Sequence, residues 1–143
     1  MVAPTVSFNS TVRLSRLADL LCNALEGGSN YWYTIEKFNK PESFELYCTE
    51  KLNESDKQEI FKHLDYPVNP GGSIVVSDRK IVENEVGGDI TSTLIDKSRL
   101  TAGLELMSKL YPRHFANFMN EDDDAETGDV FLQCCVFGKL VYG

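Results

Sequence analysis

The sequence predicts a single α+β domain, in which an antiparallel sheet of four to five strands carries about four helices, mainly on one face. Short segments alternate apolar and polar residues, which is typical of half-buried strands. Longer segments place apolar residues at helical spacing. No linker, low-complexity tract or repeat divides the 143 residues, so we expect one domain over residues 1–143.

The strands are expected where β-branched and aromatic residues gather. These segments are residues 5–12, 30–38, 73–77 and 90–95, with 44–48 as the fifth. Trp32 and its neighbours follow directly after the first helical segment, so we expect the chain to turn there into a central strand.

The helices are expected at residues 14–26, 56–64, 98–119 and 128–141. Gly27 and Gly28 follow the first helix, where paired glycines supply the positive φ that ends a helix. Asp96 can cap the third helix, and Pro112 should kink or restart it. The β-branched and aromatic content of the last segment leaves a strand open as an alternative to a helix.

The core is expected from the large apolar side chains of these elements. The residues expected to be largely buried are Leu21, Trp32, Ile35, Val75, Leu104, Phe115, Phe131 and Cys134. The last segment is apolar enough to be a fixed part of the domain, since each large side chain buried contributes about 1.5–3 kcal/mol.

The charge balance limits the kinds of partner. The chain has 22 acidic and 14 basic residues and a net charge of −8, which argues against direct binding to nucleic acid and suits a partner with a basic surface. No apolar run approaches the roughly 18 residues that cross a bilayer, and residues 1–5 lack the features of a signal peptide. We therefore expect a cytoplasmic protein without membrane association.

No pattern forms a catalytic or metal-binding signature. His63 and His114 have no partner at a characteristic spacing. The cysteines contain no C-x-x-C motif and are expected as buried apolar residues: Cys22, Cys48, Cys134 and Cys135. We expect no cofactor, no metal ion and no catalytic residues, although catalysis remains an open alternative.

The acidic residues are concentrated in one segment. Six carboxylates lie within residues 121–129: Glu121, Asp122, Asp123, Asp124, Glu126 and Asp129. A calcium loop counted from Asp122 does not fit, because Thr127 replaces the required glycine and Gln133 the bidentate glutamate. Two interpretations remain: carboxylates that favour the N-terminus of the next helix, or a negative surface presented to a basic protein groove in place of nucleic acid.

Two Gly-Gly-Ser segments, Gly27, Gly28 and Ser29 and then Gly71, Gly72 and Ser73, are candidate anion-binding nests. Neither matches a Walker loop or G-x-G-x-x-G, and chain turns are the simpler interpretation.

Tyr31 and Tyr33 would share one face of a strand, with Trp32 on the other. Core packing is one interpretation of this aromatic run. Contact with a partner or a stacked base is the other, since Tyr and Trp are enriched at interface hot spots.

Three blocks carry a resemblance to a known group of proteins: ALEGGSNYWY (24–33), YPVNPGGS (66–73) and the segment 109–143. Together they resemble small, uncharacterised accessory proteins encoded by tailed bacteriophages and prophages. The resemblance implies a protein made in the bacterial host cytoplasm, and small acidic phage proteins of this kind often disable host defence systems by binding them. It carries over no catalytic residues.

Two functions are therefore expected. The first is a phage anti-defence protein of the anti-CRISPR or anti-restriction type, which binds and inhibits a host nucleic-acid-targeting effector through an acidic surface. Its binding residues would be those of segment 121–129 together with Tyr31 and Tyr33. The alternative is a pocket protein that binds or processes an anionic ligand such as a nucleotide, with the Gly-Gly-Ser turns as its nests.

Overall fold

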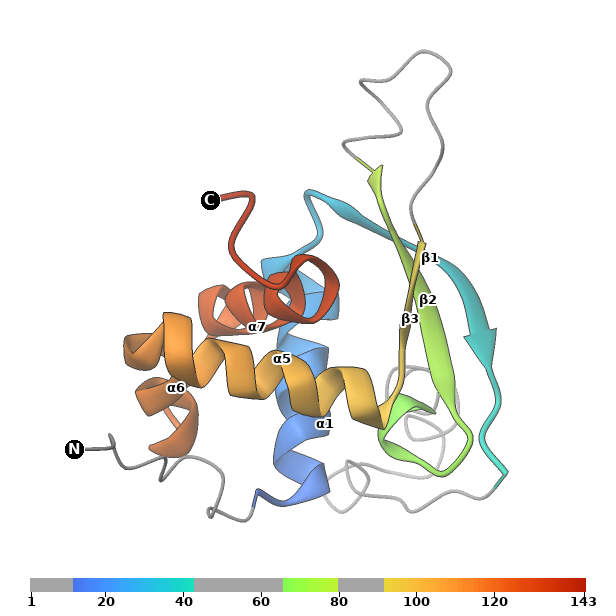
Figure 1. The fold of residues 1–143 in the computed structure, drawn as a ribbon, viewed down its shortest axis with the longest axis horizontal. Coiled ribbons are helices and arrows are strands. Elements are labelled where there is room, and N and C mark those ends of the chain that lie inside the picture. Colours follow the sequence, from blue (N-terminus) through green and yellow to red (C-terminus); the bar gives the residue numbers. More distant parts are fainter. Residues whose placement is uncertain (1–11, 43–65, 80–91) are drawn as a thin grey trace, which may run out of the picture.

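The computed structural model describes residues 12–42, 66–79 and 92–143. Within them, a three-stranded antiparallel sheet stands beside four α-helices, which all lie on the same side of it (Figure 1). The α+β class is confirmed, and the described residues contain three of the four to five expected strands. The expected elements at 44–48 and 56–64 lie outside the described residues, as does the strand at 5–12 except for Val12, which is not in a strand.

The elements follow one another in this order: α1 (Leu14–Asn23), the π-helical turn η2 (Ala24–Gly28), β1 (Tyr33–Asn39), the 3₁₀ turn η4 (Tyr66–Val68), β2 (Ser73–Asp78), β3 (Ser92–Ile95), α5 (Lys97–Leu110), α6 (Pro112–Met119) and α7 (Ala125–Phe137). The strand order β1-β2-β3 places β2 in the centre of the sheet.

The strand register decides which sheet residues reach the core. Ile74 pairs with Ile95, and both side chains are fully buried. The next residue, Val75, pairs with Leu94, which is exposed. Successive side chains of a strand point to opposite faces, so this pair lies on the face opposite to Ile74 and Ile95. Val75 is therefore only partly buried, which corrects its expected place in the core.

Helix α7 is the centre of the helical layer. Its nine consecutive residues Thr127–Cys135 are all buried, and α1, η2, α5 and α6 pack around it. A helix enclosed in this way has no solvent-facing side along its buried stretch, so its polar residues Thr127, Asp129 and Gln133 are buried as well. The helix is confirmed over the strand alternative.

Half of the expected core list is confirmed: Leu21, Trp32, Phe131 and Cys134 are buried. Ile35, Leu104 and Phe115 are only partly buried and pack against the edge of the core. In α5, for example, the residues that turn inward are Leu100, Gly103 and Met107, so Leu104 lies beside this buried stripe.

One predicted helix break is confirmed and one predicted boundary is wrong. The segment 98–119 forms two helices that separate at Pro112, as expected, because Tyr111 (φ −132°, ψ 63°) leaves the helical region directly before it. The last helix spans Ala125–Phe137 instead of 128–141. It begins at an Asp124 cap and ends at Gly138, whose φ of 79° is left-handed.

The paired glycines after α1 act differently from the prediction. Among the described glycines only Gly71 and Gly138 have a positive φ. The chain leaves α1 through the π turn instead, where the Ser29 N–H donates to the Ala24 carbonyl over 2.8 Å. A Cβ on Gly28 would lie 1.9 Å from the Ala125 carbonyl oxygen, so glycine is required here for the close packing of η2 on α7.

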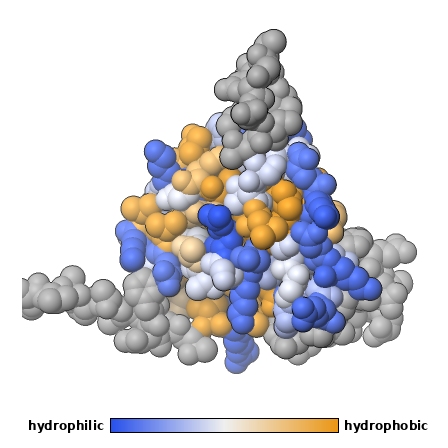
Figure 2. All heavy atoms as spheres, turned by 45° about the vertical axis from the view of Figure 1, so that its right-hand side comes forward, coloured by the Kyte–Doolittle hydropathy of each residue, from blue (hydrophilic) through white to orange (hydrophobic). Residues whose placement is uncertain are grey.

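The large apolar side chains left at the surface are Tyr31, Phe38, Leu94, Leu110, Met119 and Val141. On the face shown in Figure 2, hydrophobic side chains lie in separate patches divided by hydrophilic ones. No single apolar face dominates this view of the molecule.

We predict that a chain ending at Glu126 does not fold. It would lack the buried residues Thr127–Cys135, and the loss of several apolar side chains worth about 1.5–3 kcal/mol each is comparable with the roughly 5–15 kcal/mol that holds a domain together. Circular dichroism and thermal melting of the purified fragment test this. A soluble fragment with a cooperative melt would contradict it.

Candidate functional site

The six carboxylates of segment 121–129 occupy different environments. Glu121, Asp122, Asp124 and Glu126 are exposed, and we call these four residues the acidic face. The Asp123 side chain is only 4% exposed, and Asp129 is 8% exposed. This corrects the expectation of one negative surface built from all six residues.

Asp123 is held by two side chains of α1. Arg16 Nη2 donates to Asp123 Oδ1 over 2.6 Å, and Asn23 Nδ2 donates to Asp123 Oδ2 over 2.9 Å. Arg16 also donates to the Phe118 carbonyl over 2.7 Å, and its guanidinium lies 4.8 Å from the centre of the Phe118 ring. Arg16 thereby fastens the loop between α6 and α7 to α1.

Asp124 is the N-cap of α7. Its Oδ1 accepts a hydrogen bond from the Thr127 N–H over 2.9 Å. This bond stabilises the ionised carboxylate and lowers the pKa of Asp124. His114 Nδ1 lies 3.2 Å from the Thr127 hydroxyl, so the one described histidine contacts the same helix end. The interpretation of the carboxylates as helix-terminal residues is confirmed for Asp124.

Asp129 is the centre of a buried polar cluster. Its Oδ1 accepts from the Ser29 hydroxyl over 2.7 Å and from Trp32 Nε1 over 2.8 Å. Its Oδ2 accepts from the Tyr31 hydroxyl over 2.6 Å and from Gln133 Nε2 over 3.1 Å. A buried carboxylate is tolerated when it is hydrogen-bonded in this way. The cluster is enclosed, so Ser29 and Asp129 are not exposed as a nucleophile and base.

The two tyrosines do not form the expected strand face. Strand β1 begins only at Tyr33, and Tyr31 lies in the preceding turn. Burial, and then the hydrogen bond to Asp129, raise the pKa of the Tyr31 phenol, although 41% of the residue is exposed. The Tyr33 hydroxyl donates to the Leu25 carbonyl, and burial raises its pKa. Tyr31 is therefore partly exposed, while Tyr33 contacts η2 through its hydroxyl.

Residues 139–143, which we call the C-terminal strap, close the polar cluster from outside. Gln133 Oε1 accepts from the backbone N–H groups of Val141 and Tyr142, each over 2.8 Å. Gln133 Nε2 donates to the Tyr142 carbonyl over 3.0 Å, and the Tyr142 hydroxyl donates to Asp78 Oδ2 over 2.6 Å. The network thus extends from α7 through the strap to β2.

Sequence reasoning missed Asp78, Gln133 and Tyr142. The available signal was the spacing of Asp129 and Gln133, which are four residues apart within an apolar helical run. That spacing places both polar groups on one side of a buried helix, where they need partners.

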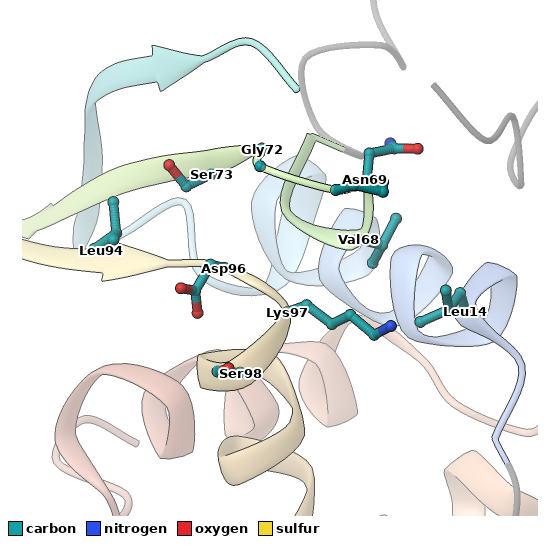
Figure 3. A pocket seen from close by; sticks show the side chains of 11 residues that line it. Leu14, Val68, Asn69, Gly72, Ser73, Leu94, Asp96, Lys97 and Ser98 are labelled. Carbon is teal, nitrogen blue, oxygen red and sulfur yellow. The ribbon is translucent and has the colours of Figure 1, made fainter. Parts of the chain in front are cut away.

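The two Gly-Gly-Ser segments are not brought together into one site. Gly27, Gly28 and Ser29 form the turn against α7 described above. Gly71, Gly72 and Ser73 line a separate open pocket of about 420 Å³ between β2, β3 and the start of α5. Figure 3 shows Asp96, Lys97 and Ser98 along its lower side, with the Lys97 side chain extending toward Leu14.

Within residues 12–42, 66–79 and 92–143, no three His, Cys, Asp or Glu side chains are grouped so that they could hold a metal ion. Cys22, Cys134 and Cys135 are buried, as predicted, while Cys48 lies outside the described residues. Burial raises the pKa of the Cys134 thiol to about 12, so this thiol stays protonated and unreactive at neutral pH.

No protein-family model, curated protein or solved structure matches this chain. In the part of the chain that the structure describes, no helix combines the length and apolar character needed to span a membrane.

We predict that Asp129→Ala destabilises the protein by about 3–5 kcal/mol, since buried donors of Ser29 and Trp32 would lose their acceptor. The control, Asp122→Ala at an exposed position, should change the free energy of unfolding by less than about 0.5 kcal/mol. Urea denaturation measures both variants. Equal stabilities would contradict a structural role for the Asp129 cluster.

We also predict a loss of stability at alkaline pH that depends on Tyr142. Burial, and then the hydrogen bond to Asp78, raise the pKa of Tyr142 from 10.0 to about 12. Because the folded state favours the neutral phenol, its contribution is complete below pH 10 and is lost as the pH rises through 12. Urea midpoints measured from pH 8 to 12 should fall less steeply for Tyr142→Phe than for the wild type, and parallel curves would contradict the assignment.

Proposed function

We propose that the protein is a non-catalytic binding protein that docks a basic surface of another protein through its acidic face. The observation that carries the proposal is that the four exposed carboxylates belong to a loop and a helix start that are held in place by hydrogen bonds. Asp123 fastens the loop to Arg16, and the Asp124 cap fixes the start of α7. Side chains on an ordered loop lose little further freedom on binding, which favours affinity.

Further carboxylates lie next to this face. Asp19 lies between Arg16 and Asn23 on the same side of α1, and it is exposed. Glu26 is exposed beside Gly27, where an added Cβ would contact the Ala125 side chain at 3.7 Å. These neighbours extend the negative charge from the acidic face over α1 and η2, which suits a basic groove.

The setting that we propose follows from the phage-like sequence blocks and the net charge of −8. The partner is a host effector that acts on nucleic acid, of the CRISPR or restriction type, and the acidic face occupies its basic nucleic-acid site. Tyr31 contributes exposed aromatic surface, which interfaces favour.

We predict that Asp122→Lys combined with Glu126→Lys weakens partner binding at least about tenfold, because two attractive charges become repulsive. Asp123 and Asp124 are left unchanged, since their reversal would break the Arg16 pair and the helix cap. The matched control is Glu42→Lys with Glu105→Lys, which changes the net charge equally at other exposed positions.

The measurement is a pull-down from bacterial lysate with each variant, followed by protein identification and by affinity measurement at several salt concentrations. The wild type and the control should capture the same basic partner, with an affinity that falls as salt rises. Equal capture by the charge-reversed variant would exclude the acidic face as the binding surface.

A second candidate function is binding of a small anionic ligand in the 420 Å³ pocket. The observation that favours it is that Gly72, Ser73, Lys97 and Ser98 line one cavity, together with the Asp96 carboxylate. A lysine and a hydroxyl beside a helix N-terminus suit a phosphate group. Titration calorimetry with nucleoside monophosphates tests this, with Lys97→Met as the variant and Lys139→Met as the control. The absence of binding by the wild type would exclude it.

A further inference from the structure

The backbone of the C-terminal strap makes several of its contacts, beside the packing of the Leu140 and Tyr142 side chains against the core. Three of its N–H groups are bound: Leu140 N–H donates to the Tyr111 hydroxyl over 2.7 Å, and the next two donate to Gln133 Oε1. The Tyr142 carbonyl accepts from Gln133 Nε2. Such contacts would be available to any extended segment of suitable length, whatever most of its side chains are.

Only one strap side chain is recognised in a specific manner. The Tyr142 ring lies 6.1 Å from Trp32, 5.9 Å from Phe137 and 6.5 Å from Tyr31, measured between ring centres. Its hydroxyl donates to Asp78, which is almost fully buried. An aromatic cage closed by a carboxylate acceptor selects tyrosine over phenylalanine, because phenylalanine would leave the acceptor without this donor.

The strap also begins at an open turn and has a side that faces solvent. Gly138 turns the chain in the left-handed region, and a Cβ added there would meet no atom of the described residues within 4 Å. Lys139 is exposed and Val141 is 48% exposed. The strap thus lies against Tyr111, Gln133 and Asp78 as a bound peptide would, with one side facing solvent.

We propose that the surface beneath residues 140–142 is a peptide-binding site, which the strap occupies in the resting chain and which takes up an extended, tyrosine-bearing segment of a partner protein. The site is formed by Gln133, Tyr111 and the cage around Asp78. This inference rests on the proposed function only in naming a partner protein as the source of the segment. The strap then acts as an internal competitor that restricts binding to segments with the matching tyrosine.

The test uses the full-length chain and a fluorescein-labelled hexapeptide, GKLVYG, which copies residues 138–143. Two variants loosen the strap alone: Tyr142→Ala removes its anchor, and Val141→Pro removes one N–H that Gln133 binds. Because an attached strap competes at an effective concentration of the order of millimolar, both variants should bind the peptide at least about tenfold more tightly than the wild type. Fluorescence anisotropy measures the binding.

Two controls establish which groups of the peptide and of the protein are needed for binding. The peptide GKLVFG should bind the loosened variants several-fold more weakly, since it cannot donate to Asp78. Gln133→Met in the Val141→Pro background should lose peptide binding, and thermal melting shows whether each variant is folded. The sole tryptophan, Trp32, provides a second readout through its fluorescence.

The outcomes separate this inference from the proposed function. Asp122→Lys with Glu126→Lys, made in the Val141→Pro background, should leave peptide binding unchanged even if it abolishes capture of the partner. Folded Tyr142→Ala and Val141→Pro chains that fail to bind GKLVYG would overturn the proposal. A wild-type dimer that the peptide dissociates would also overturn it, because the occupant would then be the strap of a second copy.

Discussion

The buried carboxylate of Asp129 is the constraint on which the other contacts depend. A charge in the core is costly unless hydrogen bonds replace its water, and here four donors converge on it. Three of them come from the turn that leads into β1, and the fourth comes from α7 itself. The need to satisfy one carboxylate therefore fixes the start of the sheet against the central helix. Through Gln133 and Tyr142, the same network reaches the strap and β2.

The segment 121–129 illustrates how chemically similar side chains acquire different roles from their surroundings. Asp129 organises the core, Asp123 fastens a loop to α1, and Asp124 begins a helix. Asp122 remains at the surface. The charges of Asp122 and Asp124 are therefore accessible to a partner, whereas those of Asp123 and Asp129 are not. Counting acidic residues therefore overstates the binding surface, while the buried members of the segment are what give the exposed ones fixed positions.

Most described helices and strands could be predicted from the sequence, because period and breakers are local signals. For example, Pro112 predicts a helix break, and the apolar spacing of α1 predicts a helix, from a few neighbouring residues alone. The site was less accessible to prediction, since its partners are distant along the chain. Ser29 lies 100 positions from Asp129, and no local pattern reveals that pair. Likewise, the π turn at Gly28 results from close packing against α7, which a pattern of paired glycines does not express.

The same packing connects the two ends of α7 to the two binding surfaces that we propose. At its N-terminus, the Asp124 cap holds the acidic face beside α1. At its C-terminus, Gly138 releases the chain into the strap, whose backbone returns to Gln133 on the same helix. Because α7 is buried on all sides, neither surface can shift without disturbing the core. A rigid central helix thus gives a small domain two surfaces in a fixed relation, so a single partner could engage both and gain affinity from their combination.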